Sequence, residues 1–466
     1  MTGWGQALRR TRRSLWALAV LVAAPLLPSA QSACGQVEHA PPAPAPQPIV
    51  IGVSLALTGA LGSFSAPLQN ATRVAEGQIN SLGGIFGRPV TFKIVDDTSD
   101  EGAIVQKAVT GLLDDGAVAL LGPVGSSQVV AAQKLAADRH VIMISPSATS
   151  PDLTTIQPSH DRYFFRTTPP DDLQGKAVAL FALRGPPRGG LDGGVDAGSV
   201  GTAFCQRIAL VHIDNSYGNA MANVIASFMP THGGTITANV TVPVKVADNY
   251  KNEVDQVIKS SPQCQALIAY DDVGDQYMVD LKNRITELPS DFIVIGTDGV
   301  YTSGFITNGR ANKADPSSPT VAEGVYGTNA DTNPPTGEFA DFKNLYNAYF
   351  PSPTNADPDA YTANMYDAAM LAVLAIVQAG TATDGVKIRD ALYQVSKGGT
   401  AYGPAQVGDA IQAIVAGQDV DYKGASGNVD LDDNGNTISD YIVWKVVNGK
   451  YADPPVDRIK ASELLQ

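Results

Sequence analysis

The feature that most constrains the fold of this chain is an alternation of strand-like and helix-like patterns in residues 120–154. Residues 118–121 and 141–144 are short apolar runs, ended by Gly or by Ser-Pro, which is typical of buried strands. Between these runs, apolar side chains recur at helical spacing, at Val129, Ala132, Leu135 and Ala136. A strand, a helix and a strand in this order predict a βαβ unit of a parallel sheet.

Two loops, residues 122–127 and 145–149, are expected side by side at one edge of that sheet. Both loops are rich in hydroxyl groups and carry no charge. Ser126 and Ser127 stand at a helix N-terminus, where free N–H groups and the helix dipole favour an anion. The two loops therefore predict a seat for one carboxylate. The alternative is that Ser126 is only a helix cap and that Ser145-Pro146 is only a helix stop.

The same alternation continues along most of the chain. Further strands are predicted at residues 49–57 and 90–95, and then, after a helix that begins at Pro169-Pro170-Asp171-Asp172, at residues 208–213, 235–242, 266–270 and 292–295. A chain of 466 residues is too long for one ordinary core, so we predict two doubly wound α/β lobes. The Gly-rich residues 185–201 are interpreted as an inserted surface loop, and the helices after Asn333 need a sheet to cover.

Composition excludes several classes of function. The chain has 46 acidic and 32 basic residues, a net charge of −14, and no Lys/Arg cluster in its body, which argues against nucleic acid as a partner. The five His residues lack ligand spacing, and no phosphate loop or nucleophile motif is present, so we predict no metal, no cofactor and no enzymatic activity. Asp96 and Asp97 are neighbours on a strand and point to opposite faces, which argues against acid-base catalysis.

Residues 1–33 have the pattern of a secretory signal peptide. Arg9, Arg10, Arg12 and Arg13 precede an apolar stretch at residues 15–27, which is too short to span a bilayer and is followed by small residues. Residues 11–15 also resemble a twin-arginine signal, so the export route stays open between the general and the twin-arginine pathways. The pattern predicts a protein of the bacterial cell envelope.

A second processing signal follows directly. Ser32-Ala33-Cys34-Gly35 is similar to a bacterial lipoprotein site, at which Cys34 becomes the lipidated first residue, although Gln31 departs from the usual Leu. Cleavage after Ser32 by ordinary signal peptidase is the alternative. The proline-rich residues 34–48 favour the lipoprotein, because such an extended tether would hold a domain off a membrane surface. No later segment is expected to span a membrane.

Near the C-terminus, Asp430, Asp432 and Asn434 before Gly435 mimic the start of a calcium-binding loop. The last ligand position of such a loop would be Tyr441, which offers no bidentate carboxylate. We therefore expect a hairpin in place of a calcium site, with residues 427–431 paired to residues 440–447.

Several short motifs together resemble one protein family. They are residues 59–66, residues 79–85 with 87–89, Asp96-Asp97, Gly122-Pro123 with Ser126-Ser127, residues 144–149, Asp172 with Gln174-Gly175, Tyr217-Gly218, Tyr366-Asp367 and residues 424–435. Over most of residues 49–450, the chain is similar to type I periplasmic solute-binding proteins, specifically the leucine/isoleucine/valine-binding family of branched-chain amino-acid transporters. The resemblance implies two Rossmann-like lobes joined by a three-crossing hinge, lobe 1 from residues 49–168 and 331–438 and lobe 2 from residues 169–330 and 439–466.

The resemblance also implies where a ligand would lie. Its α-carboxylate would be held by Ser126, by the backbone at Ser147 and by Thr149, with Ser127 and Ala148 in the same loops. Its α-ammonium would be held by Asp298 of lobe 2, and Tyr217 would close over it. Asp298 is one methylene shorter than the Glu often found in the family, and the alternative is that Asp298 only forms a turn.

The function implied by the family is capture of an amino acid or a related small carboxylate in the cleft, hinge closure, and delivery to an ABC permease in the membrane by a monomeric protein. Two alternatives stay open. One is an extracellular sensing partner of a receptor, and the other is a binder of a carboxylate or amide that lacks an amine. The sequence does not identify the solute.

In the strand order that this fold implies, the strands that follow Cys205 and Cys264 are parallel neighbours. Each Cys precedes its strand by a similar distance, and neighbouring strands are about 4.8 Å apart, which suits a disulfide in an oxidising compartment. We therefore predict a Cys205–Cys264 disulfide. The alternative is a pair of buried or loop thiols.

Overall fold

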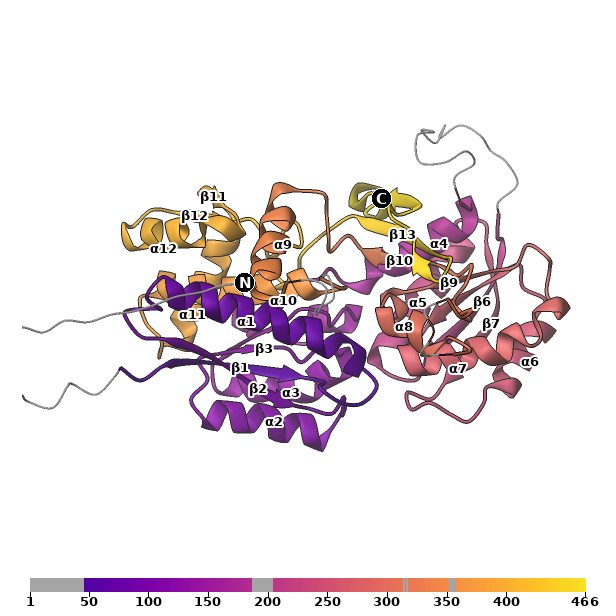
Figure 1. Cartoon of the computed structure of the whole chain (residues 1–466), viewed down its shortest axis with the longest axis horizontal. Coiled ribbons are helices and arrows are strands. Elements are labelled where there is room, and N and C mark those ends of the chain that lie inside the picture. The colour runs from indigo at the N-terminus through magenta and orange to yellow at the C-terminus, as the bar shows by residue number, and fades with distance from the viewer. Residues whose placement is uncertain (1–45, 187–203, 313–314, 316, 352–357) are drawn as a thin grey trace, which may run out of the picture. The chain divides into compact units, whose positions relative to one another are not determined.

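The computed structural model of the chain describes residues 46–186, 204–312, 315, 317–351 and 358–466. The signal segment, Cys34, nearly all of the tether and most of the Gly-rich residues 185–201 lie outside these ranges. Parallel sheets flanked by helices make up two lobes (Figure 1). This architecture confirms the predicted fold class.

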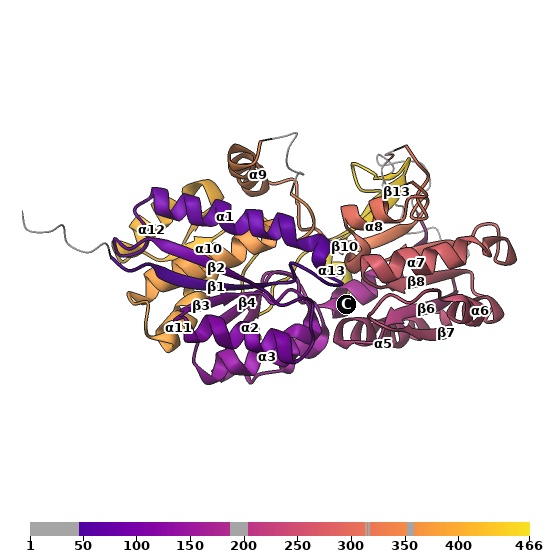
Figure 2. The ribbon, with the colours of Figure 1, turned by 60° about the horizontal axis from the view of Figure 1, so that its bottom comes forward.

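The first sheet is entirely parallel and has the strand order β2-β1-β3-β4-β5. Its strands are β1 (Ile49–Leu55), β2 (Val90–Asp96), β3 (Ala119–Leu121), β4 (Ile142–Ser145) and β5 (Phe164–Arg166). Figure 2 shows helix α1 (Ser65–Ser81) on one face of this sheet, and α2 (Ala103–Asp114) and α3 (Ser126–Asp138) on the other. Apolar side chains of α2 and α3 form a core of their own with the face they cover, because each helix turns one stripe inward.

Helices from the last third of the chain return to the first sheet. They are α9 (Gly337–Tyr349), α10 (Thr362–Ala379), α11 (Gly385–Ser396) and α12 (Val407–Val415), with a small sheet of β11 (Thr400–Tyr402) and β12 (Val420–Tyr422). Helix α10 packs against α1, β3 and β4, and Figure 1 shows it in orange beside the indigo α1. The predicted return of these helices is therefore observed.

Helix α10 corrects one expectation. Among the described residues it is a helix long and apolar enough to cross a membrane, whereas no such segment was expected after the signal. Its apolar window is 89% buried inside the protein, so α10 is a core helix. The reason is that α10 is covered on all sides and therefore needs no polar face.

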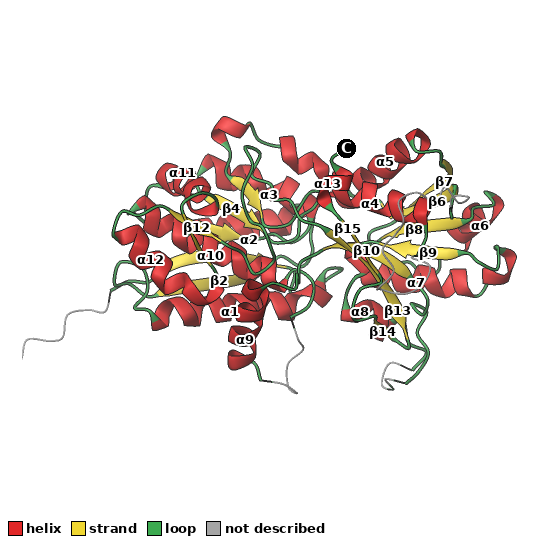
Figure 3. Cartoon of the chain, turned by 90° about the horizontal axis from the view of Figure 1, so that it is seen from above, coloured by secondary structure: helices red, strands yellow, loops and turns green. Residues whose placement is uncertain are grey.

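The second sheet has the order β14-β13-β10-β9-β8-β6-β7, and β15 pairs with β13. Its strands are β6 (Arg207–Ile213), β7 (Thr235–Val242), β8 (Cys264–Ile268), β9 (Ile293–Gly296), β10 (Tyr326–Ala330), β13 (Tyr441–Val447), β14 (Lys450–Tyr451) and β15 (Asp457–Ile459). Its helices are α4 (Asp171–Arg184), α5 (Ser216–Thr231), α6 (Lys251–Lys259), α7 (Asp271–Lys282), α8 (Ser303–Asn308) and α13 (Ala461–Leu464). The strands from β7 to β10 are parallel, with α5 and α7 on opposite faces (Figure 3).

The chain passes between the two sheets three times, at residues 167–170, 331–336 and 423–440. The last crossing shows that the expected hairpin was wrong, because residues 427–431 form no strand and β13 pairs with β10 and β15. The ring of Trp444 of β13 lies against Gly327 of β10 and leaves no room there for a β-carbon. Burial of β13 against the second sheet therefore decides its partner.

Cys205 and Cys264, the pair predicted from the sequence, form a disulfide with a Cα–Cα separation of 6.0 Å. Cys264 begins β8, and Cys205 lies just before β6, which is the parallel neighbour of β8. The bond thus joins the entry ends of two adjacent strands in the core of lobe 2.

Candidate functional site

A pocket of about 340 Å³, counting the space at its mouth, lies between the carboxyl ends of the two sheets. Ligand sites of α/β proteins lie at such strand ends. Only about 20 Å³ of this space admits the centre of a water molecule, so the side chains nearly fill the pocket with the lobes in this arrangement. Lobe 1 contributes Leu61, Phe64, Val124, Gly125, Ser126, Ser147, Thr149 and Tyr361, and lobe 2 contributes Tyr217, Tyr270, Asp298 and Gly299. Five residues predicted to bind a ligand are therefore brought together here, namely Ser126, Ser147, Thr149, Tyr217 and Asp298.

The loops after β3 and β4 lie side by side, as the βαβ pattern predicted. Gly122 makes the first turn possible, since its φ is +79° and a β-carbon there would lie 2.2 Å from the Ser54 carbonyl oxygen. Three hydrogen bonds tie the loops together: Ser145 Oγ to Pro123 O (2.6 Å), Ser147 Oγ to Val124 O (2.9 Å) and Ser150 N to Ser126 Oγ (3.1 Å). The hydroxyl-rich edge is thus a rigid feature of lobe 1.

Two hydroxyl groups at this edge are available to a ligand. Ser126 is the first residue of α3, and its oxygen accepts one backbone bond, which leaves its proton for donation. Thr149 Oγ1 is buried and has no hydrogen-bond partner within the described residues. It lies near the Asp171 carboxylate and lowers the pKa of that acid, although the two groups do not reach hydrogen-bond geometry. A buried donor without a partner beside a helix N-terminus can serve an anionic group.

Arg166 holds the Thr149 loop in place, and sequence reasoning missed it. Its guanidinium is fully buried and donates to the carbonyl oxygens of Ala148 (3.1 Å) and Ser150 (2.9 Å), on either side of Thr149. Its Nε donates to Asn436 Oδ1 (2.8 Å) in the third crossing. Burial lowers the pKa of Arg166 to about 10, so it stays charged at neutral pH. Its position at the end of an apolar run was the available signal.

Asp298 presents a buried carboxyl group from lobe 2, just after β9. Its Oδ1 accepts a hydrogen bond from the Tyr217 hydroxyl and its Oδ2 accepts one from the Tyr361 hydroxyl, both at 2.7 Å. The Thr297 hydroxyl and the backbone N–H of Gly299 also contact the Tyr217 oxygen, at 2.7 and 3.2 Å. Burial raises the pKa of Asp298, and the bonds from Tyr217 and Tyr361 lower it. Asp298 therefore has one tyrosine partner in each lobe.

A second buried acid, Asp171, was read from the sequence only as the start of a helix. Its carboxylate has no hydrogen-bond partner within the described residues, and its backbone N–H donates to the Thr149 carbonyl (2.8 Å). Burial raises its pKa well above the usual range, the charge of Asp298 raises it further, and Arg166 lowers it. Two buried acids this close do not both ionise readily, so the site favours either a proton on Asp171 or a cation beside the pair.

Two predicted site residues do not line the pocket. The Ala148 side chain packs into the core under α2 and α3. Ser127 Oγ accepts a hydrogen bond from the backbone N–H of Ser216 (3.0 Å), at the start of α5 in the other lobe. These residues belong to the loop support and to the contact between the lobes.

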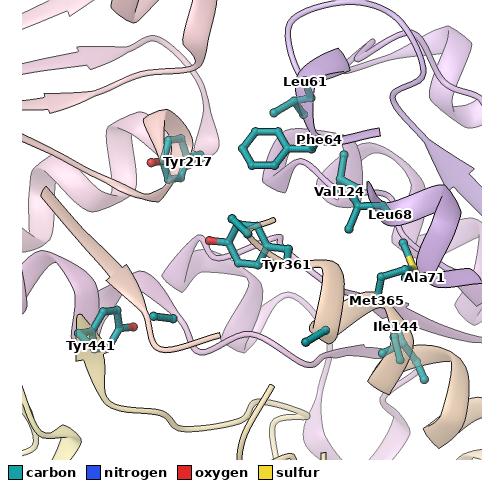
Figure 4. Packing of buried hydrophobic residues seen from close by; sticks show 14 of the residues in the cluster. Leu61, Phe64, Leu68, Ala71, Val124, Ile144, Tyr217, Tyr361, Met365 and Tyr441 are labelled. Carbon is teal, nitrogen blue, oxygen red and sulfur yellow. The ribbon is translucent and has the colours of Figure 1, made fainter. Parts of the chain in front are cut away.

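The walls of the pocket are apolar and aromatic, and sequence reasoning did not identify most of them. The rings of Tyr217 and Tyr270 stack with centroids 5.6 Å apart, and those of Phe64 and Tyr361 are 6.2 Å apart. Figure 4 shows Phe64 and Tyr361 from lobe 1 next to Tyr217 from lobe 2. Phe64 ends a short 3-10 helix, and Tyr270 and Tyr361 directly precede α7 and α10, so helical periodicity did not single these three out. Within the described ranges, no group of three or more His, Cys, Asp or Glu residues could hold a metal ion.

Comparison with known proteins extends over most of the chain. The sequence model of a family described as periplasmic binding protein matches residues 48–420. The chain is 28% identical over 414 residues to the chemotactic signal transduction system substrate-binding protein BasB of Halobacterium salinarum, covering 86% of this chain and 88% of BasB. It is 25% identical to the Leu/Ile/Val-binding protein BraC3 of Rhizobium johnstonii, covering 78% of this chain and 88% of BraC3.

A solved structure shares the fold. The branched-chain amino acid transporter substrate binding protein LivJ from Streptococcus pneumoniae, in complex with isoleucine, matches with a TM-score of 0.67 at 20% sequence identity. The match covers 89% of this chain and 99% of LivJ. The relatives and the fold are those of substrate-binding proteins and not of enzymes.

Proposed function

Because the chain belongs to the type I periplasmic binding proteins, in the group whose relatives bind branched-chain amino acids, we propose that it captures an amino acid in the interlobe pocket and delivers it to an ABC permease. Family membership implies an extracytoplasmic or periplasmic location. The proposal therefore concerns the ligand, the residues that hold it and the partner that receives it.

One observation carries the proposal of an amino-acid ligand. The same pocket offers the hydroxyl groups of Ser126 and Thr149 from lobe 1 and the carboxylate of Asp298 from lobe 2. Hydroxyl donors at a helix N-terminus suit a carboxylate, and a buried carboxylate suits an ammonium group. Donors on one wall and an acid on the other match the two charged ends of a zwitterion.

The charges around the pocket disfavour a carboxylate that lacks an amine. No Lys or Arg is among the residues that line the described pocket, and Asp171 adds a second buried acid beside Asp298. Arg166 is turned toward backbone carbonyl groups behind the Thr149 loop. An anion without an amine would therefore lie beside the Asp298 carboxyl group with no cation among the lining residues to offset its charge.

The proposed mechanism is hinge closure about the three crossings. A ligand that contacts both lobes favours the state in which the lobes meet, since only differential contact can shift such an equilibrium. Ser150 Oγ donates to the Ser216 carbonyl (3.1 Å), which adds a neutral contact between the lobes beside the pocket. We place the hinge at residues 168/169, 330/331 and 438/439, and expect the monomer with its lobes together to be the form that docks on the permease.

A second candidate function is ligand sensing, in which the ligand-bound chain docks on a receptor and not on a permease. It is favoured by the similarity to BasB, whose name describes a chemotactic signal transduction system. Both candidates use the same pocket and the same closure, and they differ only in the membrane partner. Co-purification of the chain with a permease or with a receptor from its own membranes would separate them.

The ligand proposal is tested by a thermal-shift screen followed by titration calorimetry. The screen covers aliphatic and aromatic amino acids, amides and aromatic acids, and amino acids are expected to raise the melting temperature. Asp298→Asn should weaken an amino acid by about 10- to 150-fold, because a charge-assisted hydrogen bond contributes roughly 1.5 to 3 kcal/mol. The deaminated acid with the same side chain should be affected much less. Equal losses for both ligands would show that Asp298 only shapes its turn.

A further inference from the structure

We propose that Tyr361 is a positioning residue, which completes the cation subsite from the opposite lobe and holds Asp298 in place when the two lobes meet. The inference rests on the proposed function, because it assigns a role toward the amine of the ligand. It concerns a residue that the family resemblance did not suggest.

The hydrogen bond between these two residues crosses the cleft. Tyr361 directly precedes α10, which packs against α1, β3 and β4 of lobe 1, whereas Asp298 follows β9 of lobe 2. The Tyr361 hydroxyl donates to Asp298 Oδ2 at 2.7 Å, and Tyr217 of lobe 2 donates to Oδ1 at the same distance. Each oxygen of the acid thus has one tyrosine donor, and each lobe supplies one of them.

The backbone at Tyr361 is held in an unfavourable conformation to reach this position. Its φ is +64° and its ψ is 0°, in the left-handed region that a tyrosine rarely adopts. The preceding residues are also tied to lobe 2, since Asp359 Oδ2 accepts the backbone N–H of Ser303 (3.5 Å). The Phe64 ring packs beside the Tyr361 ring, which is buried. The surrounding contacts therefore aim the hydroxyl at Asp298.

The ionisable groups around Asp298 come from several elements. They are Asp171 at the start of α4, Tyr217 of α5, Tyr361 before α10, and the phenols of Tyr270 and Tyr441, while Arg166 acts on Asp171. Burial raises the pKa of Asp298, and the hydroxyl groups of Tyr217 and Tyr361 lower it. Without the Tyr361 hydroxyl, the acid would take up a proton at a higher pH and lose its attraction for an ammonium group.

The chain offers a matched control for this pair. The Tyr422 hydroxyl donates to Asp367 Oδ1 at 2.8 Å, and both residues are buried in lobe 1 with no part in the pocket. Tyr422→Phe removes the same kind of bond between the same kinds of group. It should lower the melting temperature and leave ligand affinity and its pH dependence unchanged.

The test is titration calorimetry of wild type, Tyr361→Phe and Tyr422→Phe between about pH 8 and about pH 5. The probes are L-leucine, L-valine and L-phenylalanine, each with its deaminated acid, which are isocaproate, isovalerate and hydrocinnamate. At about pH 7, Tyr361→Phe should weaken the amino acid that binds by about 10-fold, the loss of one hydrogen bond to a charged group. The loss should grow as the pH falls, because the protonated acid cannot hold the amine, and the deaminated acids should not show this growth.

Two outcomes would overturn the inference and leave the proposed function in place. If wild type binds an amino acid and Tyr361→Phe binds it equally well at every pH, the inference fails and the proposed function stands. The inference also fails if the loss is the same for the amino acid and its deaminated acid at every pH, since that would reflect packing alone. If wild type binds none of these three, the comparison is made with the amino acid that raises the melting temperature most in the thermal-shift screen, and both proposals fail if no amino acid in that screen binds.

Discussion

Asp271, the first residue of α7, is an acid whose environment sets its behaviour. The residue is 2% exposed, and its carboxylate accepts a hydrogen bond from the Thr302 hydroxyl at 2.6 Å. Burial raises its pKa to about 6, bonds from Thr302 and Ser63 lower it, and the charges of Asp359 and Asp272 raise it. This acid lies outside the ligand pocket, so its charge can be changed without touching the proposed ligand contacts.

The raised pKa of Asp271 predicts a pH-dependent stability. A folded-state pKa of about 6, against 3.8 as the usual value, means that the folded chain binds this proton more tightly. The protonated acid then contributes on the order of 3 kcal/mol to the free energy of unfolding. This contribution is fully present below about pH 4 and is lost as the pH rises through about 6. Asp271→Asn should therefore be more stable relative to wild type at about pH 8 than at about pH 5, as measured by urea unfolding.

The control for Asp271 is its exposed neighbour. Asp272→Asn removes one charge from the same helix turn and should change stability with a much smaller dependence on pH, because the charge of Asp272 is the smallest of these influences on the pKa of Asp271. If the free energy of unfolding of wild type and of Asp271→Asn differs by the same amount at both pH values, Asp271 gains no proton in this range.

At the scale of elements, the disulfide joins the entry ends of β6 and β8 across 59 residues of sequence. Cross-linking a loop of this length restricts the unfolded chain and contributes about 4 kcal/mol in the chain-entropy account. The double variant Cys205→Ser with Cys264→Ser should therefore unfold at a clearly lower urea concentration. Wild type measured with reductant should shift in the same direction, and an unchanged midpoint in either case would contradict the prediction.

Elements also differ in how far the sequence specified them. Strands such as β7 and helices such as α4 were predicted at or close to their observed bounds, because local periodicity and Pro or Gly signals determine them. Strand β13 received the wrong partner. Strand β10 is distant from β13 in sequence, and β15 follows β13. The pairing of β13 with β10 is identified only by the packing of Trp444 against Gly327.

At the scale of the whole molecule, the proposed tether would set where the lobes work. We propose that Cys34 is lipidated and that the chain is anchored to a membrane surface. Mass spectrometry of the mature N-terminus should find an acylated Cys34, and Cys34→Ser should move the protein from the membrane fraction to the soluble fraction, because the acyl chains provide the membrane affinity. An unmodified N-terminus at Ala33 would contradict the lipoprotein proposal.

The sequence by itself determined the class of fold, the two-lobe plan and the hydroxyl-rich edge at Ser126 and Thr149. The physical reason is that strand and helix periods, helix starts and strand-end loops are local properties, and parallel strands bring such loops to one edge. Family resemblance added Asp298 and Tyr217, which follow strands in the same way.

Only the tertiary structure decided which groups act on those residues. Arg166, Asp171 and Tyr361 carry no local signature of a site, and their roles depend on partners between 5 and 270 residues away along the chain, or in the other lobe. Their burial, which sets their charge and their hydrogen bonds, is a property of the assembled lobes. Local sequence patterns do not predict which residues of the two lobes touch across the cleft, and the chemistry of this pocket depends on those contacts.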